Sequence, residues 1–232
     1  KDSVLLVLSA DHVIQDVKAF HKAINIANKQ AQSNKLAIFG IVPTDANTDY
    51  GYIKASEDNN DGAYKVDEFV EKPNLLTAQS YLEQGNYLWN SGMFMFQAKT
   101  LIGELTTHSP DIMKAVHNAV DNATQDFDFI RLEKQAFESS PNDSIDYALM
   151  EKSNNAMVVP LDARWNDIGS WSALYDIGLK DSSGNVLKGD VIAKDTINTC
   201  IYASHHMVAT IGVDNLIVVD TPDATFIASQ DK

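Results

Sequence analysis

The chain has 232 residues and a formal net charge of −14, with 44% hydrophobic and 22% charged residues. This composition supports one large globular domain, or one domain with a small appendage. A folded surface this acidic repels phosphate backbones and anionic lipids, which argues against nucleic acid and membrane surfaces as partners.

The single cysteine favours a reducing compartment, and the absence of long apolar runs argues against a membrane span. Cys200 has no second cysteine with which to form an internal disulfide, and we expect it to be a small buried hydrophobic residue. No apolar stretch reaches the length of a membrane span, and residues 1–3 do not read as part of a signal peptide. We therefore expect a cytoplasmic protein.

The first predicted elements form a β-α-β unit. Residues 4–8 are a continuous run of apolar residues, which predicts a strand buried on both faces, as in parallel sheets. Apolar residues recur at helical spacing over residues 17–31, and residues 36–42 predict a second buried strand. We expect the crossover between the strands to be right-handed. Asp11 then follows the carboxyl end of the first strand, the edge at which open α/β sheets bind ligands.

Shorter elements are predicted in the middle of the chain. Residues 58–62 indicate a hairpin turn, residues 66–70 a strand, and residues 75–84 a helix ended by Gly85. Further helices are predicted over residues 101–105, 110–123 and 144–152, and further strands over residues 93–96 and 157–161.

The sequence changes character near residue 182. Short β-prone segments without helical period follow, which predicts a domain over residues 1–181 and a small all-β appendage over residues 182–232. The predicted fold class is α/β, with a Rossmann-like mixed, mostly parallel sheet flanked by helices and incomplete at its N-terminus. A strand buried on both faces needs neighbours on each side, so we expect this chain to be the C-terminal part of a longer protein.

Two aspartates, Asp11 and Asp167, are candidate metal ligands because each stands where a buried run meets a loop. Mg²⁺ commonly takes one or two carboxylates together with substrate phosphates. Alternatively, Asp11 is an N-cap or turn residue before the first helix, and Asp167 caps the helix that begins near Ser170. The sequence leaves both interpretations open. His12 is better explained as a hydrogen-bonded structural residue than as a ligand or base.

A glutamate and a lysine, Glu71 and Lys72, stand directly before Pro73. Proline disfavours helix at the preceding residue, so we expect this pair to be extended with its side chains on opposite faces. Lysine is a suitable point charge for a phosphate, and glutamate can accept hydrogen bonds from two sugar hydroxyls. The alternative is a solvated strand end.

Two further segments offer small or polar groups. Gly51, between two tyrosines, either permits close approach of a ligand to the backbone or marks a bulged strand. Asn90 and Ser91 lie in a predicted turn, where they bind sugar hydroxyls or only shape the turn. The sequence contains no Walker loop, paired CxxC, HExxH or GxSxG, which argues against P-loop kinases, zinc hydrolases and serine esterases.

Taken in order, six segments resemble the sugar-nucleotide pyrophosphorylases, and most closely the bacterial mannose-1-phosphate guanylyltransferases among them. Each segment alone is a weak signal, and the six in order are a strong one. The likeness covers nearly the whole chain, including the tail over residues 184–224. The six segments are LSADH (8–12), YGYI (50–53), FVEKP (69–73), WNSGMF (89–94), SIDYALMEK (144–152) and WNDIGSW (165–171).

The resemblance implies a reaction in which mannose 1-phosphate and GTP form GDP-mannose and pyrophosphate. It implies that Asp11 and Asp167 hold Mg²⁺ and that Lys72 neutralises the sugar phosphate. It also implies that Glu71, Asn90 and the backbone at Gly51 orient the mannose. By family analogy, the β appendage is a candidate surface for a homodimer.

The sequence departs from the family pattern upstream of Asp11, where the glycine-rich loop that grips the nucleotide phosphates is absent. We therefore expect this chain alone to have little or no turnover. An isomerase domain that some relatives carry downstream is absent too, and residues 47–49 lack an expected glycine. The alternatives are a pyrophosphorylase for another sugar 1-phosphate or nucleotide, and a non-catalytic sugar-nucleotide-binding regulatory subunit. The retained Asp11, Lys72 and Asp167 argue against the second.

Overall fold

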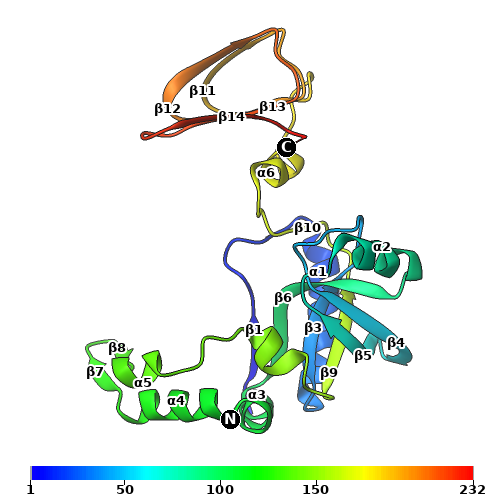
Figure 1. Ribbon diagram of the computed structural model, residues 1–232, viewed down its shortest axis with the longest axis vertical. Coiled ribbons are helices and arrows are strands. Elements are labelled where there is room, and N and C mark those ends of the chain that lie inside the picture. The colour runs from blue at the N-terminus through cyan, green and yellow to red at the C-terminus, as the bar shows by residue number, and fades with distance from the viewer. Residues whose placement is uncertain (1, 232) are drawn as a thin grey trace. The chain divides into compact units, whose positions relative to one another are not determined.

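The computed structural model of the protein describes residues 2–231 (Figure 1). By the contacts among its residues, the chain divides into two compact units. Unit 1 contains the residues up to Ala10 together with Ile14–Trp165, and unit 2 contains Asp11–Val13 together with the residues from Asn166 onward. Within residues 2–231, no helix is both long and apolar enough to cross a membrane.

Unit 1 is built on a mixed sheet, whose strand order in the described residues is β1-β6-β3-β9-β5-β4. β3 and β9 are parallel neighbours, and the other neighbouring pairs are antiparallel. It follows that β1, β3, β4 and β9 run in one direction and β5 and β6 in the other. The α/β class with a helix-flanked mixed sheet is confirmed. The strands are β1 (Val4–Val7), β3 (Leu36–Ile41), β4 (Tyr52–Asn60), β5 (Ala63–Val70), β6 (Tyr87–Gln97) and β9 (Ala156–Leu161).

β1 and β3 form the predicted β-α-β unit with α1 (Val17–Gln32), but β6 lies between them. All residues of β3 are buried, as predicted. In contrast, Leu5, Leu6 and Val7 of β1 are each about two-fifths exposed, at 41%, 37% and 42%. The prediction that β1 is buried on both faces is therefore wrong for the described residues, in which its only strand partner is β6.

β6 is longer than predicted and connects two parts of the sheet. Its first half pairs with β4 and its second half with β1, while β3 follows its other edge. Its register against β3 shifts between Asn90 and Phe94, and Gly92 has a φ of 67°. The turn predicted at Asn90 and Ser91 is thus a bulge inside one strand, because the chain finds pairing partners on both sides of it.

Two hydrophobic clusters cover the two faces of this sheet, as alternation along a strand requires. From β3, Phe39 joins the cluster that α1 covers, and Ile38 joins the cluster that contains Leu149. β3, at the centre of the sheet, is therefore buried on both faces by residues of this chain.

Several helices surround the sheet (Figure 1). α2 ends at Gly85, whose φ of 72° agrees with the predicted glycine cap. The β7–β8 hairpin and α5 were not predicted. The remaining elements of unit 1 are α2 (Leu75–Gln84), α3 (Ala98–His108), α4 (Pro110–Asp121), β7 (Thr124–Asp126), β8 (Phe129–Arg131), α5 (Lys134–Glu138) and the π-helix η1 (Asp146–Met150).

Unit 2 contains α6 and a sheet in the order β11-β12-β13-β14, which confirms the C-terminal β domain. The first three strands are parallel neighbours, and β14 is antiparallel to β13. Cys200 is buried, as predicted, and burial raises the pKa of its thiol. The domain boundary near residue 182 stays a prediction. The elements are α6 (Trp171–Ile177), β11 (Val186–Lys194), β12 (Cys200–Ile211), β13 (Leu216–Asp220) and β14 (Thr225–Ser229).

Candidate active site

Four residues of unit 1 form a connected group, here called the unit-1 polar cluster: Gly51, Glu71, Asn90 and Asp146. Gly51 precedes β4, Glu71 follows β5, Asn90 lies in the bulge of β6, and Asp146 begins η1. Three of these residues were predicted from the sequence to bind substrate. The sheet brings them together because β4 pairs with both β5 and β6.

Hydrogen bonds fix the orientation of Asn90 within the cluster. Its backbone N–H donates to the Gly51 carbonyl oxygen at 2.7 Å. Its side-chain Nδ2 donates to Asp146 Oδ1 at 2.9 Å, and its Oδ1 accepts the Gly92 N–H at 3.1 Å. The amide therefore has one defined orientation, with its nitrogen directed to the carboxylate side.

Gly51 leaves room for the Glu71 side chain. A Cβ atom at position 51 would lie 2.4 Å from Glu71 Oε2, well inside van der Waals contact. The carboxylate of Glu71 thus occupies the space that any other residue at position 51 would fill. This contact explains the glycine by the close approach of a side chain of the same protein, whereas the predicted approach of a ligand to the backbone stays a prediction.

Glu71 carries an unsatisfied acceptor. Its Oε2 atom is buried and has no hydrogen-bond partner in the described structure. Burial raises the pKa of this carboxyl group, the charge of Asp146 raises it further, and the charge of Lys72 lowers it. Buried polar atoms in native proteins are almost always hydrogen-bonded, so an exception calls for an explanation such as a ligand.

Asp146 is the member of the cluster that was not predicted as a site residue. Burial raises the pKa of its carboxyl group, whereas the hydrogen bond from Asn90 lowers it. The sequence contained it only as part of the SIDYALMEK segment. Nothing local shows that a residue beginning a helix faces an asparagine 56 positions earlier, so only the tertiary structure finds this contact.

The Glu71–Lys72 pair is not extended, contrary to the prediction. Lys72 has a φ of 45°, in the left-handed region, although it is not glycine and precedes Pro73. Its side chain is exposed. Non-glycine residues in this region store strain and are concentrated at functional sites. The chain therefore turns sharply after β5, and this turn carries Glu71 into the cluster.

Aromatic rings lie next to Gly51. The ring of Tyr50 is 5.0 Å from that of Trp89 and 5.6 Å from that of Trp165, measured between centroids. Trp89 belongs to the core cluster under α1, and Tyr50 and Trp165 pack against it. These rings hold the segment before β4 in place and provide an apolar wall beside the polar cluster.

The two predicted metal ligands, Asp11 and Asp167, both belong to unit 2. Asp11 precedes β2 (Val13–Ile14), and Asp167 directly follows β10 (Trp165–Asn166). β2 and β10 pair with each other. The two segments run antiparallel, as the hydrogen bonds of residues 15 and 16 to residues 164 and 163 show. Both aspartates therefore flank the same end of one short ladder, although they are 156 positions apart in sequence.

Neither aspartate caps a helix, which was the alternative interpretation of Asp167 and one of the two alternatives for Asp11, the other being a turn residue. Asp16 caps α1, with its Oδ1 accepting the Ala19 N–H at 3.0 Å. Ser170 caps α6, with its hydroxyl accepting the Ala173 N–H at 3.1 Å. With helix capping assigned to these two residues, the carboxylate of Asp167 is held instead in a tight turn.

That turn is held by two short-range hydrogen bonds. The Ile168 N–H donates to Asn166 Oδ1 at 2.7 Å, and the Gly169 N–H donates to Asp167 Oδ1 at 3.3 Å. Ile168 has a φ of 51°, which is rare for a β-branched residue. After the strained turn at Lys72, this is the second strained turn beside a predicted site residue. Because it fixes the carboxylate of Asp167, it indicates a functional segment at this position.

Comparison with known proteins agrees with the geometry. A family model described as nucleotidyl transferase matches residues 1–184, and a model described as mannoseP isomerase/GMP-like beta-helix domain matches residues 189–232. The chain belongs to the nucleotidyl transferase family.

Several relatives of this nucleotidyl transferase have similar sequences over nearly its whole length. It is 51% identical over 232 residues to a mannose-1-phosphate guanylyltransferase of Salmonella muenchen, covering 100% of the chain and 49% of that relative. It is 50% identical over 231 residues to the xanthan biosynthesis protein XanB of Xanthomonas campestris pv. campestris (strain B100), covering 100% and 49%. The chain thus spans about half the length of the curated relatives that it matches.

A solved structure confirms the fold of this nucleotidyl transferase. The crystal structure of mannose-1-phosphate geranyltransferase from Thermus thermophilus superimposes with a TM-score of 0.85 and 32% sequence identity. The match covers 98% of this chain and 66% of that one. The fold of this chain is therefore also found in a solved structure.

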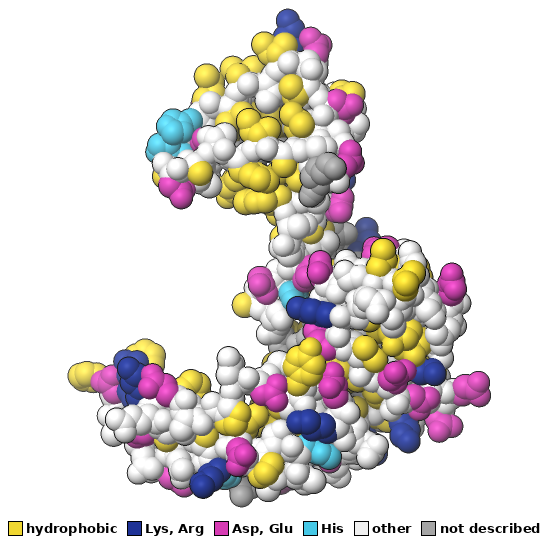
Figure 2. All heavy atoms as spheres, in the orientation of Figure 1, with side chains coloured by type: hydrophobic (Ala, Val, Ile, Leu, Met, Phe, Trp, Pro, Cys, Tyr) yellow, Lys and Arg dark blue, Asp and Glu magenta, His cyan; other side chains and the backbone are white. Residues whose placement is uncertain are grey.

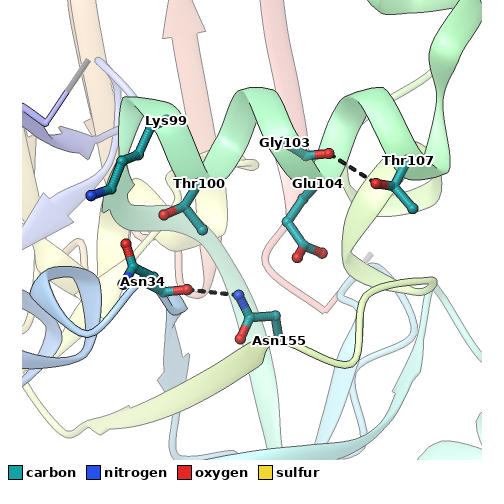
Figure 3. A pocket seen from close by; sticks show the side chains of 7 residues that line it. All are labelled: Asn34, Lys99, Thr100, Gly103, Glu104, Thr107 and Asn155. Atoms are coloured by element: carbon teal, nitrogen blue, oxygen red, sulfur yellow. Dashed lines mark hydrogen bonds between the residues drawn. The ribbon is translucent and has the colours of Figure 1, made fainter.

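A separate concave region of unit 1 contains none of the predicted residues (Figure 3). Asn34 and Asn155 line it just before β3 and β9, at the amino ends of these strands. Ligands of α/β sheets bind at the carboxyl ends, so the nucleotidyl transferase site is assigned elsewhere. The residues that line this pocket are Asn34, Lys99, Thr100, Gly103, Glu104, Thr107 and Asn155.

Proposed function

We propose that the protein that contains this chain forms GDP-mannose and pyrophosphate from mannose 1-phosphate and GTP. The observation that carries this proposal is the buried, unpaired Oε2 of Glu71 beside Gly51. An unpaired carboxylate oxygen is an acceptor for a sugar hydroxyl, which would satisfy it on binding. The relatives named mannose-1-phosphate guanylyltransferase support the choice of sugar and nucleotide.

In this proposal, the unit-1 polar cluster orients the sugar. Glu71 accepts hydrogen bonds from sugar hydroxyls. Asn90 is preset by Asp146 and the Gly92 N–H, so its remaining Nδ2 hydrogen is free to donate to the sugar. Lys72, exposed beside Glu71, neutralises the phosphate of mannose 1-phosphate. A preset site of this kind lowers the entropy that binding must overcome.

Asp11 and Asp167 are proposed to hold a Mg²⁺ ion. Two carboxylates at one end of a short ladder offer hard oxygen donors, the ligand chemistry that Mg²⁺ prefers. When bound, the ion supplies positive charge that neutralises the polyphosphate and stabilises the charge of the transition state. Such local positive charge is needed in a chain whose net charge is −14.

The chemical step is an in-line displacement at the α-phosphorus of GTP. A phosphate oxygen of mannose 1-phosphate forms a bond to that phosphorus, and the bond from the α-phosphorus to the bridging oxygen of the β-phosphate breaks. The products are GDP-mannose and pyrophosphate, so atoms and charge balance. The residues named above contribute positioning and charge stabilisation, the main sources of catalysis in phosphoryl-type transfer.

The test measures pyrophosphate release by the protein at its full encoded length, with mannose 1-phosphate, GTP and Mg²⁺. We expect Glu71→Gln to lower kcat/KM roughly 10- to 100-fold, as removal of a hydrogen bond to a charged group does. We expect Asp167→Asn to abolish magnesium-dependent turnover. Asp61→Asn, in the exposed β4–β5 turn, serves as a control and should retain the activity of the unchanged protein.

Three outcomes separate the alternatives. Turnover with another nucleoside triphosphate or sugar 1-phosphate in preference to GTP and mannose 1-phosphate would replace the proposed substrates. Binding without turnover, unaffected by Asp167→Asn, would support a regulatory subunit instead. Full activity of Glu71→Gln would contradict the role of the unpaired carboxylate.

We also propose that the protein is cytoplasmic and forms a homodimer through the β-strands of unit 2. The cytoplasmic location is supported by the single cysteine, which favours a reducing compartment, and the homodimer is supported by family analogy. Light scattering of the purified full-length protein measures the oligomeric state, and a monomeric mass would contradict the dimer.

A further inference from the structure

Two histidines and an aspartate form a cluster in unit 2 that the proposed reaction does not use. Among the described residues, His205, His206 and Asp220 are the group of His, Cys, Asp or Glu side chains whose ligand atoms all lie within 4.8 Å of one another. Figure 2 shows histidine surface, in cyan, at one corner of the β-strand body of unit 2. We propose that this cluster binds one divalent transition-metal ion of the Zn²⁺ class.

The fold builds the cluster with an irregularity in β12. In the pairing of β11 with β12, Gly189 is opposite Ala203 and Val191 is opposite Val208. More residues therefore lie between Ala203 and Val208 on β12 than between Gly189 and Val191 on β11. The extra residues of β12, which include His205 and His206, bulge from the ladder. On the other side of β12, Ala203 is opposite Asp220, so the aspartate lies beside the bulge.

Asp220 is a preorganised carboxylate. It is buried at 3% exposure. Its Oδ2 accepts the His206 N–H at 2.7 Å, and its Oδ1 accepts the Thr225 hydroxyl at 2.9 Å. The hydrogen bond from His206 is the main reason that the pKa of Asp220 is lowered. Each oxygen of an ionised carboxylate has a further lone pair, so these contacts orient Asp220 and leave it able to coordinate a metal.

The spacing of the ligand atoms suits a tetrahedral ion. Nδ1 of His205 lies 3.1 Å from the ring nitrogens of His206, and Nδ1 of His206 lies 3.4 Å from an oxygen of Asp220. Ligands at bond lengths of about 2.0–2.1 Å around a tetrahedral centre are about 3.3 Å apart. Small rotations of the two exposed rings are therefore sufficient to direct three donor atoms at one ion, with water in the remaining position.

The donor set distinguishes this proposed ion from the Mg²⁺ of the proposed reaction. Two imidazole nitrogens and one carboxylate oxygen favour Zn²⁺, Co²⁺ or Ni²⁺, whereas Mg²⁺ prefers oxygen donors and retains its water. The expected role of the ion is to tie the bulge of β12 to the end of β13. A bound ion that recognises only the folded state stabilises that state by mass action.

The experiment titrates Zn²⁺ into the chelator-treated full chain, followed by calorimetry and by competition with a fluorescent zinc indicator. We expect one ion per chain, no binding of Mg²⁺ at this site, and a melting temperature that rises with Zn²⁺. His205→Gln and His206→Gln should each weaken binding roughly tenfold or more, as loss of a metal contact does. Both side chains are exposed, so neither change should prevent folding.

His117→Gln is the matched control, because His117 is an exposed histidine on α4 in unit 1. It should bind Zn²⁺ as the unchanged chain does. Substitution with Co²⁺ gives a direct readout, since a tetrahedral site produces visible absorption that both cluster variants should lose. The proposal is overturned if the unchanged chain binds no Zn²⁺, or if the cluster variants and the control bind it equally well.

Discussion

Glu71 in unit 1 is half-buried and Asp220 in unit 2 is buried, each beside other polar groups, yet their environments are opposite. Asp220 receives hydrogen bonds on both oxygens, and its pKa is lowered. Glu71 has one oxygen without a partner, and its pKa is raised by burial and by the charge of Asp146. The folded chain therefore stabilises the ionised form of Asp220 and destabilises the ionised form of Glu71.

The difference indicates which carboxylate receives hydrogen bonds on both oxygens within the chain and which one keeps an oxygen without a partner. A residue that serves the fold has its hydrogen bonds made within the chain. A residue that serves binding keeps an acceptor open and lowers the stability of the unliganded protein in doing so. Substitutions at the two positions should therefore change the stability of the unliganded protein in opposite directions.

Among the substitutions that test this comparison, the largest effect is expected for Gly51→Ala in the full-length protein. The new Cβ would displace the flexible end of Glu71, so pyrophosphate release should fall about a hundredfold, the scale for a misplaced active-site group. The melting temperature should change little, because a side-chain tip can move. Gly103→Ala, which has open space around its Cβ, is the control. Undiminished activity of Gly51→Ala would remove Glu71 from the site.

A smaller effect, on stability, is expected for Asp220→Asn. The amide can no longer accept both the His206 N–H and the Thr225 hydroxyl, so one of these two partly buried hydrogen bonds is lost. The melting temperature, followed by circular dichroism without added metal, should fall by several degrees. An unchanged value would mean that the hydrogen bonds to Asp220 do not support the fold.

The same chemical change at Glu71 should have the opposite sign. Glu71→Gln removes a charge that the folded state destabilises, so the melting temperature of the unliganded protein should rise slightly while activity falls. Thermal unfolding beside the Asp220→Asn variant measures the contrast. A marked decrease for Glu71→Gln would show that its carboxylate is structural.

The smallest effect is expected for the pH dependence of the contributions that Asp220 and Glu71 make to the free energy of unfolding. The pKa of Asp220 is lowered in the folded state, so its contribution is fully present above its ordinary value of 3.8 and is lost as pH falls through the folded value. The pKa of Glu71 is raised, so its destabilisation begins above its ordinary value of 4.5 and is complete above the folded value. Chemical unfolding of the two variants and the unchanged protein from about pH 3 to 7, a window around these values, tests both signs.

Two strands show how far sequence patterns can be trusted here. Val4–Val7 and Leu36–Ile41 are both continuous apolar runs, and both form strands. Only the second is buried, because β6 and β9 flank it and hydrophobic clusters cover both its faces. An apolar run thus predicts a strand, whereas its burial depends on neighbours that are distant in sequence.

The candidate site likewise contains features that the sequence predicted and features that it did not. Gly51, Glu71 and Asn90 were predicted as residue types suited to a sugar phosphate, and the sheet places them in contact. Asp146 was missed because its partner is 56 positions away. The left-handed turn at Lys72 was missed because proline ordinarily favours an extended residue before it, and tertiary packing outweighs that preference here.

The sequence alone determined the kinds of element, the β-rich C-terminal region and the family, because periodicity and ordered motifs are local properties of the chain. The tertiary structure decided which carboxylates are satisfied and which are not. That distinction depends on hydrogen bonds between residues far apart in sequence, such as Asn90 with Asp146 and His206 with Asp220. Packing of η1 against the sheet creates the first contact and the pairing of β12 with β13 creates the second, and no local pattern encodes either.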